Sequence, residues 1–375
     1  MRVLLISVRA DHGGGPEHIA RLIEAAPADV QFTVACPRDL PYWGRYVQLL
    51  GSDNLIEIPH RAFRLGPLLR LAAAVRACGV QVIHSHGKGA GIYGRALRVL
   101  TGLPVVHTFH GLHTGSYGRC GRVVYIAFER LLGYLTSCTI AVSDGEGEQL
   151  RRAGLGKHLR VIVNGVRIPA MPTQEPVGPP YHVVMMTRYD YQKRAEMVVD
   201  IAEALHARGV LDQFIFELLG TGPGRGALAA ALPARGLADA VRVFGAVDDS
   251  GSYLRGAFAY LSTSRWEGMP LAVLEAMGHG VPVVATDVVG NRDAVTEGGT
   301  GFLYEESAPE AAADALLALA RNPGLWSRTS QAARSTALKW YSADRMSHET
   351  VACYRALLKQ DARSAGPSLV GCGSP

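Results

Sequence analysis

The sequence lacks any uncharged apolar run near the roughly 20 residues that a membrane-spanning helix requires. Its first residues are also poor in uncharged apolar sequence, because Arg2 and Arg9 enclose only a short, mostly apolar stretch. This stretch is too short for a signal-peptide core and is predicted to form a first strand. We therefore expect any membrane contact to be peripheral.

Cysteine is scarce and scattered: the six cysteines form no Cys-x-x-Cys pair, and no His/Cys cluster has the sequence spacing of a metal site. Such cysteines suit a reducing compartment, so a cytoplasmic location is expected. No Asp-x-Asp metal motif follows a predicted strand. We therefore predict no metal and no other cofactor.

Acidic residues are missing from the whole stretch between Glu57 and Glu129, whereas nine Lys and Arg residues lie there. Residues 1–170 carry 20 Lys/Arg against 11 Asp/Glu, and the remainder carries 18 against 22. A basic first half attracts anions such as lipid headgroups, a lipid-linked diphosphate or nucleic acid. An ordinary solvated basic face is an equal alternative to membrane contact. No nucleic-acid module is present, and we expect no nucleic-acid partner.

Short apolar, β-branched runs alternate with helical patterns along the whole chain, which is 48% hydrophobic and 19% charged. The pattern predicts an α/β fold with two Rossmann-like, doubly wound domains facing across a cleft. The expected organisation is a first domain at 1–168, a Pro-rich linker at 169–180, a second domain at 181–342, a terminal helix at 343–360 and a flexible tail at 361–375.

Two carboxylates, Glu267 and Glu275, flank a predicted helix start at Pro270. Proline suits the first helical position, and a helix N-terminus favours an anion such as a diphosphate. Glu275 lies roughly 7 Å further along the axis, so one carboxylate can meet a sugar and the other a ribose. The alternative is that Glu267 only complements the helix dipole and Glu275 is solvated.

Other candidate ligand groups follow predicted strands. Arg188 and Lys193 can converge on a diphosphate, the first as a bidentate fork and the second as a point charge. Gly14 and Gly15 allow close approach of a phosphate or sugar at a helix start, although an ordinary strand-to-helix turn explains them equally. The run from Gly220 to Gly224 has Arg225 at the third glycine position of a dinucleotide fingerprint, which argues against NAD binding.

The stretches Glu-Gly-Met-Pro-Leu at 267–271 and Leu-Glu-Ala-Met-Gly at 274–278, with Arg188-x4-Lys193, Thr108-x-His110-Gly111 and the glycine loop, resemble the signature of retaining family 4 glycosyltransferases with the GT-B fold. The resemblance implies that Glu267 and His110 face the transferred sugar, that Arg188 and Lys193 stabilise the departing diphosphate, and that Glu275 contacts the ribose. It also implies that residues 1–168 form the acceptor domain, that residues 181–342 form the nucleotide-sugar donor domain, and that the last helix packs back on the first domain. The implied donor-binding residues are Gly14, Gly15, Arg188, Lys193, Ala246, Val247, Glu267, Gly268, Met269, Pro270, Leu271 and Glu275.

Some residues depart from the family pattern. Arg194 stands where glycine usually follows the lysine, Arg167 replaces an Asp in the hinge turn after Asn164 and Gly165, and Asp293 stands where Glu is frequent. Arg194 and Arg167 affect the conformation of two turns, and Asp293 affects one expected contact. None of the three changes removes a residue with an implied role in the reaction. A weaker candidate for acceptor contact is the segment from His84 to Lys88.

The sequence thus predicts a metal-independent, retaining transferase that moves a hexosyl or N-acetylhexosaminyl group from a nucleotide sugar. The expected acceptor is a lipid-linked glycan at the inner membrane face, in polysaccharide assembly, and peripheral contact with an anionic membrane is expected there. The alternatives are a transferase with a soluble small-molecule acceptor, a GT-B nucleotide-sugar epimerase, and a binding protein without turnover.

Overall fold

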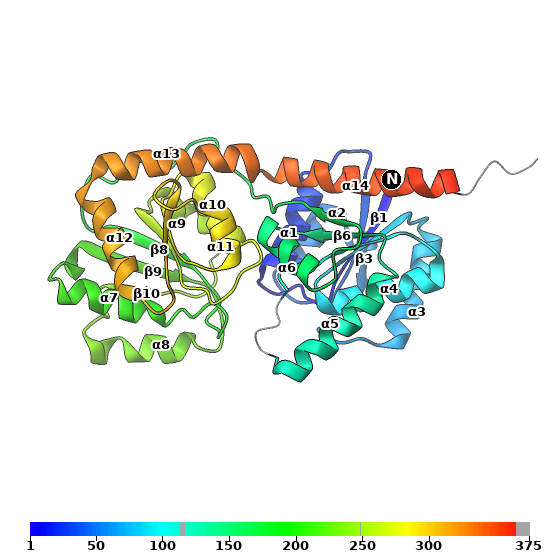
Figure 1. The fold of residues 1–375 in the computed structure, drawn as a ribbon, viewed down its shortest axis with the longest axis horizontal. Helices are drawn as coiled ribbons and strands as arrows, with labels where there is room; N and C mark the ends of the chain where they lie inside the picture. Colours follow the sequence, from blue (N-terminus) through cyan, green and yellow to red (C-terminus); the bar gives the residue numbers. More distant parts are fainter. Residues whose placement is uncertain (113–116, 248, 365–375) are drawn as a thin grey trace, which may run out of the picture.

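The computed structural model describes residues 1–112, 117–247 and 249–364, with side chains up to Gln360. Figure 1 shows two α/β domains side by side, spanned along one edge by two long helices near the C-terminus. The predicted α/β class with two doubly wound, Rossmann-like sheets is confirmed.

The first domain contains a seven-stranded parallel sheet with the order β3-β2-β1-β4-β5-β6-β7. Its strands are β1 (Arg2–Ser7), β2 (Gln31–Cys36), β3 (Leu55–Glu57), β4 (Val82–His86), β5 (Val105–Thr108), β6 (Cys138–Ala141) and β7 (Leu159–Val161). Its helices are α1 (Gly14–Glu24), α2 (Tyr42–Leu50), α3 (Leu65–Ala77), α4 (Lys88–Thr101), α5 (Arg119–Gly133) and α6 (Asp144–Arg152), with a short 3₁₀ helix at Ser52–Asn54. Strands β2 and β3 lie on one side of β1, whereas β4 to β7 lie on its other side, so the strand order reverses between β1 and β4. Ligands of such folds bind beside the carboxyl ends of the strands at that point.

The second domain contains a six-stranded parallel sheet with the order β10-β9-β8-β11-β12-β13. Its strands are β8 (Tyr181–Met186), β9 (Phe214–Leu219), β10 (Val241–Val243), β11 (Ala259–Ser262), β12 (Val283–Thr286) and β13 (Gly301–Tyr304). Its helices are α7 (Met197–Ala207), α8 (Arg225–Ala231), α9 (Ser250–Arg255), α10 (Leu271–His279), α11 (Val289–Ala294), α12 (Pro309–Arg321) and α13 (Pro323–Trp340), with 3₁₀ helices at Leu211–Gln213 and Pro233–Arg235. Here the reversal falls between β8 and β11, which precede the Arg188 and Glu267 loops.

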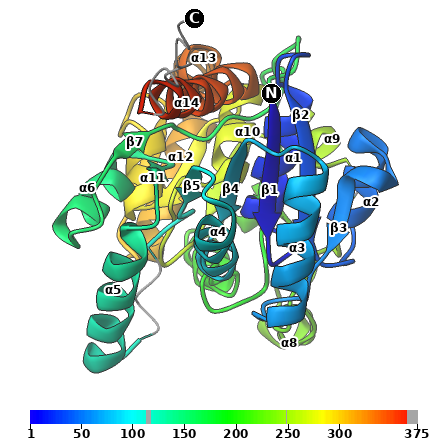
Figure 2. The same cartoon turned by 90° about the vertical axis from the view of Figure 1, so that its right-hand side faces the viewer.

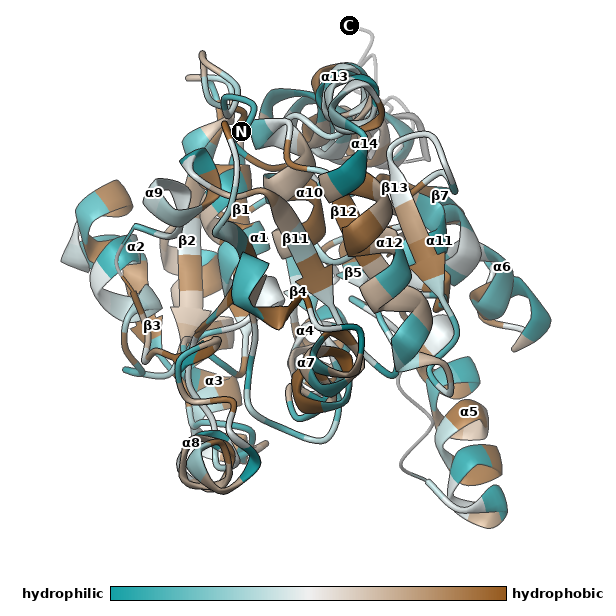
Figure 3. Ribbon diagram, turned by 90° about the vertical axis from the view of Figure 1, so that its left-hand side faces the viewer, coloured by the Kyte–Doolittle hydropathy of each residue, from teal (hydrophilic) through white to brown (hydrophobic). Residues whose placement is uncertain are grey.

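Burial explains why the central strands are almost continuously apolar. Helices cover both faces of a parallel sheet, so residues pointing to either side are removed from water. All residues of β11 and β12 are buried, and Figure 3 shows the apolar colouring concentrated in strands and in α10. The sheets therefore form a rigid base for loops at their carboxyl edges.

The chain crosses between the domains at two adjacent places. Val166 forms a parallel bridge with Ser342, just before helix α14 (Ala343–Ser364) begins. This last helix packs against α1, and the Ser347 hydroxyl donates to the Leu22 carbonyl across 3.0 Å. Figure 2 shows α14 running over the edge of the first domain. Residues from the end of the chain therefore complete the core of the domain at its beginning.

Several local expectations were wrong. Helix α10 begins at Leu271, and Pro270 is its N-cap with an extended ψ of 106°. Residues Val289–Ala294, expected in a loop, form helix α11. Helix α14 continues to Ser364, so the first four residues of the expected tail are helical, and residues 365–375 lie outside the described residues. Within the described residues, no helix has the length and apolarity needed to cross a bilayer.

Candidate donor-sugar site

Two helix N-termini, one from each domain, meet at the proposed donor site. A Cβ atom on Gly14, the first residue of α1, would lie 3.9 Å from Cδ1 of Leu271, the first residue of α10. A Cβ on Gly15 would meet no atom within 4 Å, so there is space beside the backbone. The N-terminal amides of both helices carry partial positive charge. Gly14, Gly15, Pro270 and Leu271 are thus brought together in a place suited to an anion.

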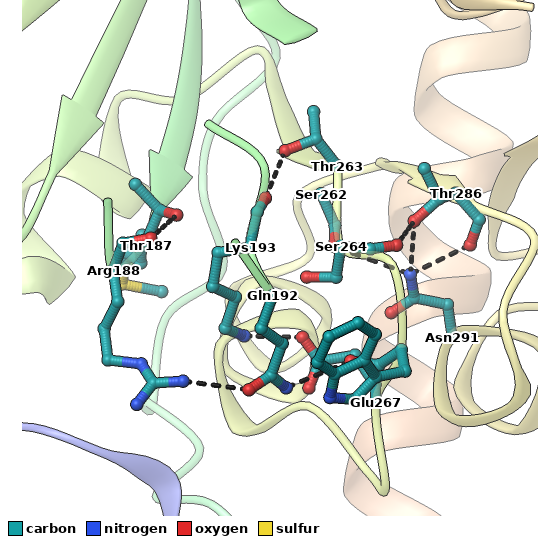
Figure 4. Close-up of polar contacts among 12 residues, drawn as sticks. Thr187, Arg188, Gln192, Lys193, Ser262, Thr263, Ser264, Glu267, Thr286 and Asn291 are labelled. Atoms are coloured by element: carbon teal, nitrogen blue, oxygen red, sulfur yellow. Dashed lines mark hydrogen bonds and ion pairs between the residues drawn. The ribbon is translucent and has the colours of Figure 1, made fainter. Parts of the chain in front are cut away.

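Arg188 and Lys193 lie on the loop after β8 and approach this region from the second domain (Figure 4). Nη2 of Arg188 donates to Oε1 of Gln192 across 2.9 Å and lies 3.1 Å from Oδ2 of Asp190. The Lys193 amide donates to Oδ1 of Asp190 across 3.0 Å. Asp190 therefore holds the loop so that both cations face the same side, as a diphosphate-binding pair requires.

Glu267 is paired with Lys193: its Oε1 lies 2.5 Å from Nζ, and the carboxylate is only 8% exposed (Figure 4). The Gln192 side chain also donates to the Trp266 carbonyl across 3.0 Å, which joins the cation loop to the Glu267 loop. A carboxylate so deeply buried is stabilised by the adjacent ammonium group. Glu267 thus has a fixed position, with its second oxygen available to a ligand hydroxyl.

Glycines allow the Glu267 loop to contact the first domain. A Cβ on Gly268 would lie 2.9 Å from the amide nitrogen of Gly111 and 3.1 Å from the carbonyl carbon of His110. A Cβ on Gly290 would lie 2.6 Å from the Gly268 carbonyl oxygen. These distances are shorter than real Cβ contacts, so side chains at either position would push the loops apart. Gly268 therefore lets its loop contact the His110–Gly111 turn of the first domain, and Gly290 lets helix α11 contact the Gly268 backbone.

Glu275 lies one turn into α10 and reaches toward α1 of the first domain. Its Oε1 is 3.9 Å from Nη2 of Arg21, and its side chain is 19% exposed. Burial, with a further contribution from Glu17, raises the pKa of Glu275 to about 7, although Arg21 and Arg45 oppose the shift. The carboxyl group is thus not simply solvated, and a ligand that donates hydrogen bonds to it would favour its ionised form.

His110 follows β5 in a left-handed conformation with φ of 58°, which is rare for a residue with a side chain. The next amide, of Gly111, donates to the Glu146 carboxylate, which also accepts from the Val142 amide across 2.7 Å. Burial raises the pKa of Glu146 to about 7. Glu146 therefore anchors the turn that holds His110, a role that the sequence analysis did not assign.

His110 also belongs to a group of three histidines with His18 and His86, which offer ligand atoms within 4.8 Å of one another. Nδ1 of His18 donates to Oδ1 of Asn164 across 2.9 Å, while Nδ2 of Asn164 donates to the Met269 carbonyl across 2.9 Å. Burial lowers the pKa of His18 to about 4, so its ring is neutral at physiological pH. Neutral imidazoles can hydrogen-bond sugar hydroxyls or ligate a metal ion. The sequence spacing missed this group because its members come from three separate segments.

His84, by contrast, is part of the core. Its Nδ1 lies 2.5 Å from the Tyr354 hydroxyl on α14, and its Nε2 lies 2.8 Å from Oγ1 of Thr108. The ring is fully buried, which leaves it no contact with an acceptor. The expectation that His84 takes part in acceptor contact is therefore wrong.

A pocket of about 360 Å³ opens between the two domains beside Glu267. Gly111, Leu112 and Gln149 of the first domain line one side, and residues 265–267, 287–289 and 292 of the second domain line the other. The pocket is large enough for a sugar ring and is adjacent to the loop that carries His110.

The two remaining predicted donor residues lie on the loop after β10. Ala246 is exposed, while Val247 is partly buried against the core of the second domain. The Gly220 amide donates to the Gly245 carbonyl across 2.8 Å, so this loop is tied to the glycine-rich turn after β9. Backbone groups of Ala246 and Val247 thus lie at the same carboxyl edge of the sheet as Arg188.

Two facing Rossmann-like domains, a pocket between them and a last helix that returns to the first domain define a protein of the GT-B class. Two family models match the chain: "Glycosyltransferase Family 4" over residues 12–168 and "Glycosyl transferases group 1" over residues 180–322. Together they cover most of the sequence. The chain therefore belongs to the family 4 glycosyltransferases, as its motifs indicated.

Curated relatives agree with this assignment. The phosphatidyl-myo-inositol mannosyltransferase of Mycobacterium leprae is 32% identical over 66% of this chain and 66% of its own length. An Escherichia coli UDP-Gal:alpha-D-GlcNAc-diphosphoundecaprenol alpha-1,3-galactosyltransferase is 26% identical over 60% of this chain and 62% of its own. A GDP-mannose:cellobiosyl-diphosphopolyprenol alpha-mannosyltransferase of Xanthomonas campestris is 26% identical over 64% of each. The chain thus spans slightly less than two thirds of the length of these relatives.

Solved structures share the whole architecture. Anabaena HepE, in complex with UDP and glucose, superposes with a TM-score of 0.81 at 17% identity, covering 95% of this chain and 100% of HepE. Sucrose-phosphate synthase from Thermosynechococcus elongatus gives a TM-score of 0.78 at 22% identity, covering 96% of this chain and 99% of that structure. At these identities the likeness establishes the GT-B fold.

Proposed function

We propose that this protein transfers a hexosyl or N-acetylhexosaminyl group from a nucleotide sugar to an acceptor hydroxyl, with retention of anomeric configuration and without a metal ion. The observation that carries the proposal is the buried Lys193–Glu267 pair, which lies on the same loops as Arg188 and the N-terminus of α10. Cations and helix amides can together neutralise a departing diphosphate, which is the main electrostatic demand of the reaction.

The roles proposed for the residues follow from their positions. Arg188, Lys193 and the amides at Leu271 would hold the diphosphate, Glu275 would accept hydrogen bonds from the ribose, and backbone groups at Ala246 and Val247 would contact the base. Glu267 and His110 would contact the hydroxyls of the transferred sugar from opposite domains. These contacts would orient the sugar and exclude water from the pocket between the domains.

Retention is proposed from the resemblance to the retaining family, and the ion pair of Glu267 bears on which retaining route is used. This carboxylate is held by Lys193, which lowers its value as a nucleophile, because an ion-paired oxygen attacks less readily. We therefore favour departure and attack on one face of the sugar. The bond from the anomeric carbon to the diphosphate oxygen breaks, the acceptor oxygen bonds to the same carbon, and a phosphate oxygen takes the hydroxyl proton.

The acceptor is proposed to be a lipid-linked glycan, with the enzyme in peripheral contact with the membrane surface that carries it. Support comes from the Escherichia coli and Xanthomonas relatives, whose names specify acceptors on a diphosphate-linked polyprenol. The basic first domain is consistent with an anionic lipid acceptor. Assembly of a surface polysaccharide is the process in which such a product would be used.

The first test is a thermal-shift panel of UDP-, GDP-, ADP- and dTDP-sugars with and without EDTA. A donor that binds only the native state raises the melting temperature. We expect a shift with one nucleotide, unchanged by EDTA and lost in Lys193→Ala. The anomeric configuration of the product, measured by NMR, tests retention. Turnover that falls on addition of EDTA and returns with a divalent ion would refute the metal-independent mechanism. His18, His86 and His110 would then be the candidate metal ligands.

A further inference from the structure

Helix α5 presents large apolar side chains to solvent. Val123 and Val124 are each 68% exposed, Phe128 is 43% exposed and Leu131 is 66% exposed. Figures 1 and 2 show the helix standing at the margin of the first domain, and Figure 3 shows apolar segments along it. A contiguous exposed apolar surface of this kind marks an interaction site.

The apolar residues lie on the side of the helix that faces away from the protein. Glu129 is the buried residue of α5 and marks its inner side. At about 100° per residue, Val124, Leu131 and Tyr134 project opposite to Glu129. The exposed apolar surface is therefore one outward-facing stripe, which we call the α5 stripe: Val123, Val124, Phe128, Leu131 and Tyr134.

The inner side of α5 is held by polar contacts that do not involve the stripe. Nη2 of Arg95 lies 3.2 Å from Oε2 of Glu129, and both side chains are 2% exposed. The Lys88 ammonium group lies 4.4 Å from the ring centre of Tyr125. Nε of Arg130 donates to the Ala153 carbonyl across 2.8 Å. The Lys157 ammonium group lies 5.0 Å from the ring centre of Tyr134, at the C-terminal end of the stripe. The fold of α5 thus depends on its inner contacts, and the exposed valine, phenylalanine and leucine side chains of the stripe are available to a partner.

The charge around the stripe is positive. Arg119, Arg122 and Arg130 lie on α5, and its acidic residue, Glu129, is buried against Arg95. A second copy of this chain would bring like charges together across a symmetric interface, which opposes self-association. Anionic lipid headgroups complement the arginines, while the acyl region accepts the apolar stripe.

We propose that α5 is an interfacial helix that lies on an anionic lipid bilayer, with the α5 stripe among the upper acyl chains and Arg119, which flanks the stripe, at the headgroups. At about 1.5 Å per residue its length is roughly 22 Å, which suits lying in the membrane plane rather than crossing it. Gly111 and Leu112, which line the pocket between the domains, belong to the same domain as α5. Binding through α5 brings that pocket to the lipid surface, and this part of the inference rests on the proposed lipid-linked acceptor.

The test is flotation of the full-length protein with extruded vesicles of phosphatidylcholine alone or with about 30% phosphatidylglycerol, a composition at which polybasic segments bind. The wild type is expected to float with the anionic vesicles and to be released at high salt. Val124→Ser/Phe128→Ser/Leu131→Ser is expected to lower the vesicle partition coefficient by more than about tenfold. Arg119→Gln is expected to lower it about fivefold.

A matched control replaces exposed apolar residues elsewhere: Met171→Ser/Val177→Ser/Leu338→Ser, at positions at least as open to solvent. This variant is expected to float like the wild type. Circular dichroism and melting temperature verify that all variants fold, and no substituted residue belongs to the donor site. Equal flotation of the wild type and the stripe variant would overturn the proposal, as would failure of the wild type to float.

Two further measurements separate the outcomes. Analytical ultracentrifugation that detects a dimer abolished by the stripe variant would assign the stripe to a second copy and overturn the membrane assignment. If no nucleotide sugar shifts the melting temperature while α5-dependent flotation persists, the proposed function fails and the membrane surface stands. If donor binding is normal and flotation is absent, the membrane inference fails alone.

Discussion

Replacement of Glu275 by Gln tests whether burial controls the ionisation of the donor-site carboxylate. In the folded protein, burial raises the pKa of Glu275 to about 7 from its ordinary value of 4.5. A carboxyl group with a raised pKa binds its proton more tightly when folded, so it stabilises the fold at low pH and loses that contribution as pH rises toward the folded pKa. The window of the effect is therefore about pH 4.5 to 7.

The magnitude follows from linkage. A shift of about 2.5 units corresponds to roughly 3 kcal/mol, of which about 2.5 kcal/mol is lost between pH 5 and pH 8. For a chain of 375 residues this is roughly 3 °C in melting temperature. Glu275→Gln carries no such titration. The melting temperature of the variant minus that of the wild type should therefore increase by roughly 3 °C from pH 5 to pH 8.

The comparison of two proteins at each pH is essential, because Glu146 also has a pKa raised to about 7 by burial. Its contribution is common to the wild type and the variant and cancels in the difference. Glu310→Gln, which removes an exposed acid on α12, controls for the loss of one charge. A difference that stays constant from pH 5 to pH 8 would refute the reasoning, because it would mean that Glu275 is ionised throughout.

Three other substitutions test separate parts of the structure. Lys193→Ala removes the cation that lies 2.5 Å from Glu267 and leaves the Glu267 carboxylate unpaired. It should weaken donor binding more than tenfold in titration calorimetry. Unchanged affinity would show that Lys193 does not belong to the site. Gly268→Ala places a Cβ atom 2.9 Å from the Gly111 amide nitrogen. It should lower kcat about tenfold or more, because the two loops must move apart. Turnover at the wild-type rate would show that the loops can accommodate the methyl group without loss of activity. Tyr354→Phe removes the hydroxyl group that Nδ1 of His84 contacts. It should lower the free energy of unfolding in urea by about 1–3 kcal/mol, while donor affinity stays constant. A loss of donor affinity without a loss of stability would argue against a structural role.

The central part of the fold could be predicted from the sequence because it depends on continuous apolar runs. Strands β1, β8 and β12 are such runs, and their order with the intervening helices defines two doubly wound sheets. The edge strands β3 and β13 have weak sequence signals, since Leu55–Glu57 is short and partly exposed and Gly301–Tyr304 begins with glycine. Helix α13 also has a weak signal, because its pattern contains many small and polar residues.

The candidate site was predicted where its residues follow one another in a motif, as Glu267 to Leu271 do. Contacts between residues far apart in the sequence were not predicted. The side chain of Asn164, for example, donates a hydrogen bond to the carbonyl of Met269, which lies 105 positions later. Glu146 had a local signal, because Ser143 and Glu146 have the spacing of a helix capping box, and the Ser143 hydroxyl accepts from the Glu146 amide across 3.1 Å. The sequence does not indicate that the Glu146 carboxylate continues to the Gly111 amide, because that contact depends on how β5 and α6 are placed.

The return of α14 to the first domain has a consequence for biosynthesis. Met346, Val351, Cys353 and Tyr354 belong to the same buried cluster as residues of β1, β2 and α1. A ribosome delivers those strands first, yet the side chains that close their core are among the last to emerge. The first domain must therefore wait, with an apolar groove uncovered, until the second domain has been made. Truncation after residue 342 would remove nothing from the sheet of the second domain and would expose the interior of the first.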